Sequence, residues 1–155
     1  MGRVYAVPFE GVAVTVAVDF FEISPADDKP CKILGVFLSQ SSDVGDAAEE
    51  ILRLEIIRGH TSSGSGGIAP TPTPLEPNDA AAGFAAEVNN TTIASAGSTV
   101  IAWAHAFNIR SGLELWFPQG CEPKANQGNT TLVVRLMAAP ADSLTMSGTL
   151  FVEEM

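Results

Sequence analysis

Apolar and polar residues alternate with a period of two along most of the apolar segments of this chain. The clearest example is the segment 11–23, in which alternate positions hold Val12, Val14, Val16, Val18 and Phe20. Successive side chains of a β-strand point to opposite faces of its sheet, so such alternation is typical of a strand with one buried face. The segments 51–59, 130–138 and 147–155 show the same pattern.

Other apolar segments complete the expected set of strands. The segment 31–40 is apolar at nearly every position and is predicted to be buried on both faces. A short first strand is expected over 4–9 and a weaker one over 86–92. The segments 99–109 and 113–118 are also predicted strands, although the register of the first stays open. Eight or nine strands are expected, with at most one helical turn over 43–51.

A long stretch without secondary-structure signals, residues 59–83, divides the chain. It contains "SSGSGG" and "PTPTP", which predict a flexible part and a stiff, extended part. If it were a linker, each flanking half would be a four-stranded sheet with a wet apolar face. Packing the two sheets together buries both faces. We therefore expect one domain over 1–155, an all-β antiparallel two-sheet sandwich with 59–83 as a long central loop.

Composition and charge narrow the function classes. The 155 residues are 46% hydrophobic and 17% charged, as in a globular domain, and the net charge is −10. Nucleic acid and anionic membranes are unlikely partners for so acidic a surface. Neither a secretion signal nor an apolar segment of membrane-spanning length is evident, so a cytosolic product is expected. Cys31 and Cys121 are then expected to be free thiols.

The sequence contains none of the common catalytic or cofactor-binding signatures. It has no H-E-x-x-H or G-x-S-x-G pattern and neither a phosphate-binding nor a dinucleotide-binding loop. Of the two histidines, His105 lies in an apolar segment and is expected in the interior or at an interface, while His60 is expected in solvent. We predict no enzyme activity, no catalytic residues, no cofactor and no metal site. A small enzyme with scattered site residues stays a minor alternative.

Two further groups of residues have a structural and a functional interpretation. Four acids lie within eight residues, at Asp43, Asp46, Glu49 and Glu50. They could bind a hard cation, but a solvated helical turn is the preferred interpretation. Trp103 and Trp116 could stack on sugars, but tryptophans in strands are more often part of the core.

The central loop offers a candidate contact surface for a partner protein. Its apolar residues lie in a proline-rich context that pre-orders an extended chain and lowers the entropy lost on docking. The candidate contact residues are Ile68, Pro70, Pro72, Pro74 and Leu75. A disordered loop without function is the alternative.

Three segments resemble small all-β proteins of tailed bacteriophages, of the head decoration (cement) or related virion type. They are "ILGVFLSQSSDVGDAAEEILRLEIIRG" (33–59), "AAAGFAAEVNNTT" (80–92) and "APADSLTMSGTLFVEEM" (139–155). Together with the central loop they cover most of the chain. The resemblance rests on strand and turn sequences and transfers no functional residues.

The resemblance implies a jelly-roll sandwich with a structural role. Such a protein would assemble in the host cytoplasm and bind the major capsid protein on the outer surface of the phage head. It would be a homo-oligomer, a trimer in preference to a dimer, without nucleic acid or membrane as partners. The alternative from another class is a carbohydrate-binding or receptor-binding fibre module, since sandwich folds also serve as lectins.

Overall fold

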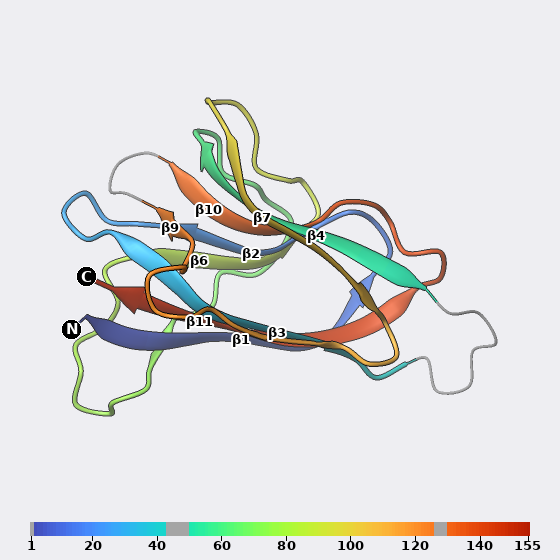
Figure 1. Ribbon diagram of the computed structural model, residues 1–155, viewed down its shortest axis with the longest axis horizontal. Coiled ribbons are helices and arrows are strands. Elements are labelled where there is room, and N and C mark those ends of the chain that lie inside the picture. Colours follow the sequence, from blue (N-terminus) through green and yellow to red (C-terminus); the bar gives the residue numbers. More distant parts are fainter. Residues whose placement is uncertain (1, 43–49, 126–129) are drawn as a thin grey trace.

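The computed structural model describes residues 2–42, 50–125 and 130–155, which contain no helix (Figure 1). None of these residues forms a helix that could span a membrane. Eleven strands form two antiparallel sheets packed face to face. The strands are β1 (Arg3–Val14), β2 (Asp19–Ser24), β3 (Cys31–Gln40), β4 (Ile51–His60), β5 (Thr73–Pro74), β6 (Ala85–Asn90), β7 (Val100–Asn108), β8 (Leu113–Trp116), β9 (Lys124–Ala125), β10 (Thr131–Leu136) and β11 (Leu144–Glu154).

The strand order is that of a jelly roll. Sheet A has the order β5-β1-β11-β3-β8, and β9 also pairs with β3, while sheet B has the order β6-β2-β10-β4-β7. The strands β1 to β4 lie alternately in sheet A and in sheet B. The last two strands are inserted between them: β10 lies between β2 and β4, and β11 lies between β1 and β3. The predicted fold class, an all-β antiparallel sandwich of jelly-roll type, is therefore confirmed. Eleven strands replace the expected eight or nine, partly because β5 and β9 have two residues each, too few to give a pattern.

The predicted strand over 11–23 is divided between the two sheets. Val12 to Val14 end β1 in sheet A, and Asp19 begins β2 in sheet B. Val16 lies at the corner between them and is exposed, so its prediction as a core residue is wrong. The alternation of apolar and polar residues is not interrupted at the corner, because Val14 before the corner and Val18 after it are both buried.

The core lies between the two sheets and is formed by the inward faces of both. Six side chains that are fully buried in it come from six different strands: Tyr5, Phe20, Ile33, Leu54, Leu132 and Leu150. The prediction that β3 is buried on both faces is wrong, since Lys32, Leu34 and Phe37 are half-buried. Their side of sheet A faces solvent, because no other layer of the described residues covers that face.

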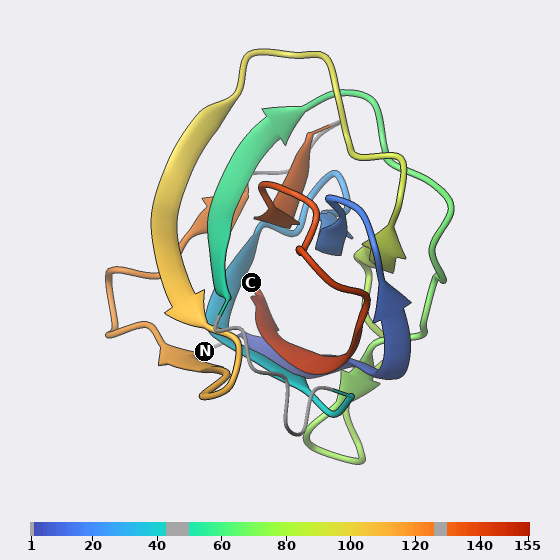
Figure 2. The same ribbon diagram turned by 90° about the vertical axis from the view of Figure 1, so that its right-hand side faces the viewer.

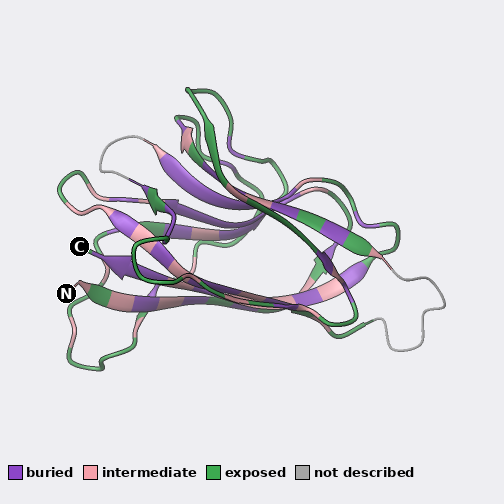
Figure 3. Cartoon of the chain, in the orientation of Figure 1, coloured by how far each residue is buried: buried purple, intermediate pink, exposed green. Residues whose placement is uncertain are grey.

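Sheet B, in contrast, is buried on both faces at its centre (Figure 3). All six residues of β10 are buried. Val133 packs with Ala94 and Ile57 in a second, smaller apolar cluster outside the main core. Asp19, which the alternation places toward solvent, is fully buried and forms an ion pair with Arg135. Segments 61–68 and 91–98 cover this outer face.

Candidate functional site

Segment 61–83 crosses one side of the sandwich, from the edge of sheet B to the edge of sheet A (Figure 2). At its start, the backbones of Ile68 and Val88 exchange two hydrogen bonds, of 3.1 and 2.8 Å. Further along, β5 pairs with β1, and the Leu75 N–H donates to the Val4 carbonyl at 2.9 Å. The segment is therefore attached to both sheets and is not a separate arm.

The five predicted contact residues do not form one exposed strip. Ile68 and Leu75 are 66% and 54% exposed, as a contact surface requires. Pro72 is buried, and Pro70 and Pro74 are half-buried. Ile68 lies beside β6 and Leu75 beside β1, so the two exposed side chains belong to the edges of different sheets.

The glycine-rich part of this segment is packed and hydrogen-bonded against sheet B, where composition alone gives no sign of such packing. The buried Glu22 carboxylate accepts hydrogen bonds from the Gly64 N–H and the Asn90 side chain, both at 3.0 Å. A Cβ atom on Gly67 would lie 2.0 Å from the Val88 carbonyl oxygen. The glycines are required here because the two backbones approach too closely for a side chain.

The opposite side of the sandwich carries an unprotected edge strand. β7 is the last strand of sheet B, and within the described residues it pairs with β4 alone. Its nine residues, "VIAWAHAFN", include no Asp, Glu, Lys, Arg or Pro, and most of them are exposed (Figure 3). The pairing is irregular near Ile101 and regular from Trp103 to Asn108. Exposed edges are usually protected by charges, prolines or bulges, so the regular part is open to pairing with another strand.

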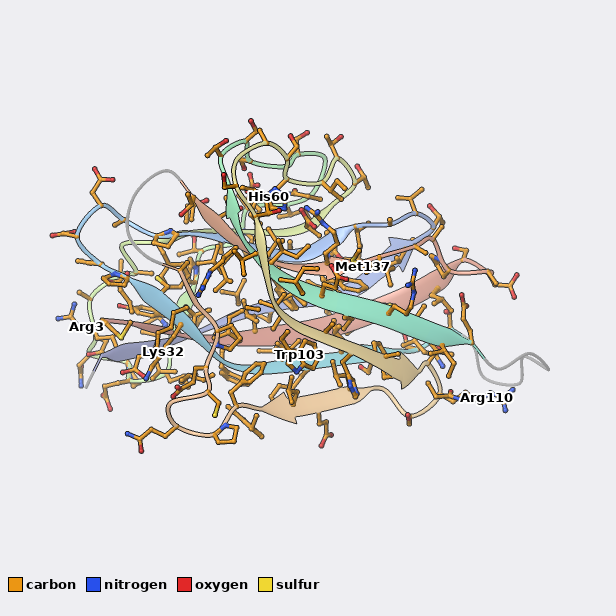
Figure 4. All side chains as sticks on the ribbon, turned by 45° about the horizontal axis from the view of Figure 1, so that its top comes forward. Arg3, Lys32, His60, Trp103, Arg110 and Met137 are labelled. Atoms are coloured by element: carbon orange, nitrogen blue, oxygen red, sulfur yellow. The ribbon has the colours of Figure 1, made fainter. Side chains whose placement is uncertain are left out.

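Aromatic side chains extend this surface from β7 to β8. Trp103 packs against Phe117 with ring centroids 5.9 Å apart, and Figure 4 shows it on the β7 side of the molecule. Trp116 on β8 is 59% exposed. The prediction that the tryptophans belong to the core is therefore wrong for Trp116, whereas Trp103 is half-buried and packs against the core. We call the exposed residues of β7 together with Trp103, Trp116 and Phe117 the β7–β8 side.

A cluster of aromatic rings lies on the solvent-facing side of sheet A. Trp116 and Phe151 stack at 5.1 Å, and both rings contact Phe37. Gly35 lies between Trp116 and Phe151 in the sheet, and a Cβ atom there would lie 2.7 Å from the Trp116 ring. The glycine thus allows the two rings to meet above the strand.

A shallow groove of about 450 Å³ adjoins the aromatic cluster at Phe37. It crosses the outer face of sheet A between β1 and β8. Its polar residues supply hydroxyl groups and two carboxylates: Glu10, Ser39, Ser111, Glu114, Ser147 and Thr149. Hydroxyls and carboxylates beside an exposed aromatic ring can bind a polar ring compound such as a sugar.

The two histidines differ in their environments. His105 is exposed on β7, so it is not an interior residue, and its expected place at an interface stays a prediction. His60 is buried rather than solvated, and its Nδ1 lies 3.3 Å from the Ala96 carbonyl oxygen, to which it donates. His60 lies beneath the loops that cover sheet B (Figure 4). The exposure of each histidine depends on whether a loop covers it, and the residues that flank the histidine in the sequence do not indicate this.

Candidate metal ligands are not brought together in the part of the chain that the structure describes. Within residues 2–42, 50–125 and 130–155, no three His, Cys, Asp or Glu side chains form a group that could bind a metal ion. Asp43, Asp46 and Glu49 of the acidic cluster lie outside these residues. Glu50 lies beside the start of β4, where its Oε1 accepts a hydrogen bond from the Ala141 N–H at 2.5 Å.

A charged network joins the chain ends to β3. Lys32 Nζ lies 2.9 Å from Glu153 and 3.4 Å from Glu122, and the Gly2 N–H donates to Glu153 at 2.7 Å. The hydrogen bond with Glu153 raises the pKa of Lys32. Backbone hydrogen bonds and Lys32 lower the pKa of Glu122. Burial opposes ionisation of Glu153, but Lys32 and the Gly2 N–H outweigh it and lower its pKa. These groups are paired with one another by ion pairs and hydrogen bonds, and this pairing stabilises the fold.

Comparison with known proteins gives no relative. No family model matches the chain, and neither a curated protein nor a solved structure is similar to it at a significant level.

Proposed function

We propose that this protein is a non-enzymatic virion structural protein, a decoration protein that binds the outer surface of a phage head as a homo-oligomer. The observation that carries the proposal is the exposed, uncharged strand β7 at the edge of sheet B. The sequence resemblance to phage head proteins supplies the virion context. The jelly-roll fold is compatible with this role but does not select it, since many functions share such folds.

The charge of the chain favours the β7–β8 side as the contact between copies. At a net charge of −10, two copies repel each other over most of their surfaces. β7 has no charged residue, and its own Trp103, packed against Phe117 next to β8, supplies aromatic area that interfaces favour. A copy that approaches through this side removes an open sheet edge and exposed apolar surface from water without bringing acids together. The resemblance implies a trimer.

The test of the oligomer is its mass in solution, measured by light scattering during gel filtration. The wild-type chain should have three times the 16.2 kDa of one chain. Ala104→Lys places a charge in the regular part of β7 and should give the single-chain mass. Ala139→Lys, at an exposed loop position, is the matched control and should leave the mass unchanged. A wild-type monomer, or an Ala104→Lys variant of unchanged mass, contradicts the proposed interface.

The virion role is tested separately on particles. Virions purified from the phage or prophage that carries this gene should contain the chain in a fixed ratio to the major capsid protein. Added protein should sediment with heads that lack it. Its absence from purified virions contradicts the virion role, whatever the oligomeric state.

A second candidate function is carbohydrate binding, and it is favoured by a specific observation. The exposed Trp116 ring, stacked on Phe151, adjoins the groove through Phe37. If this surface binds sugars, a glycan array should show binding that Trp116→Ala abolishes. A decoration protein without lectin activity should show no glycan binding, so the array separates the two functions.

A further inference from the structure

The groove on the outer face of sheet A carries a carboxylate at each end and no positive charge between them. It has a volume of about 450 Å³ and crosses the sheet from β1 to β8. Of its twelve lining residues, two are acidic and none is basic. Glu10 lies on β1 and Glu114 on β8, and both side chains are exposed. Arg110 adjoins the groove residue Ser111 in the chain but does not line the groove.

Neither carboxylate has a counter-charge within the described residues. The ion pairs there involve other acids: Asp19, Asp79, Glu122, Glu153 and Glu154. The carboxylates of Glu10 and Glu114 accept no hydrogen bond there either. In a chain of net charge −10, a ligand that brings positive charge to this groove is complementary to it.

The β8 end of the groove combines a carboxylate with an aromatic ring. Phe37 and Glu114 lie directly opposite each other in the pairing of β3 with β8, so their Cβ atoms are about 4.5–5.5 Å apart on the same face. The Phe37 ring is held in place by contacts with Trp116 and Phe151. An ammonium or guanidinium group interacts favourably with both a carboxylate and an aromatic ring. This end therefore suits the side chain of a lysine or an arginine.

Hydroxyl groups occupy the middle of the groove. Thr149 lies opposite Phe37, and Ser147 lies opposite Ser39, in the pairing of β11 with β3. The Ser147 Oγ accepts a hydrogen bond from the Gly11 N–H at 3.0 Å and keeps its own proton to donate. A hydroxyl is both a donor and an acceptor, so this row can pair with the C=O and N–H groups of a peptide backbone.

The distance between the two ends selects the spacing of the positive charges. Three steps between neighbouring strands separate β1 from β8, which is about 14 Å. In an extended peptide, residues i and i+4 point to the same side and lie about 13 Å apart. Two basic residues with three residues between them therefore match the two carboxylates.

We infer that this groove binds an extended segment of a partner protein with basic residues at positions i and i+4. One basic side chain pairs with Glu114 beside Phe37, and the other pairs with Glu10. The hydroxyl row binds the backbone between them. A neutral sugar in the same groove would leave both negative charges unmatched. The inference does not depend on the proposed oligomer, because no residue of the β7–β8 side lines the groove.

The test titrates the peptide acetyl-KASAK-amide into isotope-labelled protein and follows the binding by NMR. The salt concentration is about 0.01 M, where exposed charges are weakly screened. The backbone amide resonances of Ser39, Ser147 and Thr149 should shift together and saturate, with a dissociation constant on the order of 1 mM. The isomer acetyl-KKASA-amide has the same composition and charge, but its adjacent lysines point to opposite sides of an extended chain. It should bind at least about threefold more weakly.

Two variants test the carboxylates themselves. Glu10→Gln and Glu114→Gln each remove one charge from an exposed position, and each should weaken binding of acetyl-KASAK-amide at least about threefold. Asp28→Asn removes the same charge at an exposed turn before β3, whereas the groove lies near the end of that strand. This matched control should bind the peptide as the wild type does, because the net charge of the protein changes equally in all three variants.

Four results would overturn the inference. The first is an absence of saturable shifts at Ser39, Ser147 and Thr149. The second is equal binding of the two isomeric peptides, which would show that the spacing of the charges is not read. The third is unchanged binding by Glu10→Gln and Glu114→Gln variants whose spectra match that of the wild type. The fourth is equally tight binding of 1,8-diaminooctane or methyl glucoside at the same residues, which would assign the groove to a small diamine or a sugar.

Discussion

At the scale of single residues, the ion pair between Asp19 and Arg135 joins a loop to the outer face of sheet B. Arg135 Nε and Nη2 donate to the two Asp19 oxygens at 2.6 and 3.1 Å. Asp19 also accepts from the Ala94 N–H at 2.7 Å, and Arg135 donates to the Ala94 carbonyl at 2.8 Å. Both charges are thus satisfied beneath the segment that covers them.

Removing Arg135 should therefore be costly. In Arg135→Met, the fully buried Asp19 carboxylate loses its counter-ion, which typically destabilises a protein by about 3–5 kcal/mol. Urea denaturation measures the change in free energy of unfolding. Arg53→Met, at an exposed position of β4, is the control and should change stability by less than about 0.5 kcal/mol. A loss below about 1 kcal/mol for Arg135→Met would contradict the importance of the pair.

The two cysteines should differ in reactivity. Both are free thiols, Cys31 buried and Cys121 exposed. Burial, assisted by the charge of Glu154, raises the pKa of Cys31 to about 12, so its reactive thiolate is absent at neutral pH. In native protein without reductant, a thiol reagent should titrate one group rapidly, and two after denaturation. Titration of both groups at similar rates in the native state would be inconsistent with the burial of Cys31.

At the scale of elements, the glycine-rich part of segment 61–83 behaves as a packed layer on sheet B. Its backbone pairs with the segment 88–95 through Ser62, Ser65 and Ile68. It also supplies a partner for the buried Glu22. We therefore expect that replacing 62–75 with a short turn would destabilise the domain, in contrast to what its composition predicts.

A single methyl group should reveal this packing. Gly67→Ala brings a Cβ atom to 2.0 Å from the Val88 oxygen, so one of the two backbones must move. Overpacking of this kind costs about 1–3 kcal/mol in the free energy of unfolding. Ser65→Ala, two residues away with an exposed side chain, should be nearly neutral. Equal melting temperatures for the two variants would indicate that the segment can move freely.

The elements also show why the sequence predicts some features and not others. Alternation locates β4, β10 and β11 because one face of each strand packs in the core. It fails at Val16 because a corner between sheets does not interrupt the pattern. It misses the burial of Asp19 and His60 because this depends on loops that are distant in sequence.

At the scale of the whole molecule, the network of Lys32, Glu122 and Glu153 links stability to pH. The pKa values of both carboxyl groups are lowered from about 4.5 in the folded state. Their contribution to stability is therefore fully present above pH about 4.5 and is lost as the pH falls through the lowered pKa values. The pKa of Lys32 is raised from 10.5, so its contribution is fully present below that pH and is lost only above it.

Lys32→Met should make this dependence visible. The variant should be less stable than the wild type at pH 7, and the difference should shrink as the pH falls from 5 to 3. Urea denaturation at pH 7, 5 and 3 measures it. Lys124→Met removes the same charge at an exposed position, and its effect should change less with pH. A Lys32→Met difference that stays constant from pH 7 to pH 3 would exclude this coupling.

The placement of Trp103 and Trp116 gives the molecule an intrinsic optical reporter. The chain has two tryptophans, and both lie on the β7–β8 side. A second copy that covers this side should shift their fluorescence emission and protect them from acrylamide quenching. Unlabelled protein can thus report self-association by its own emission.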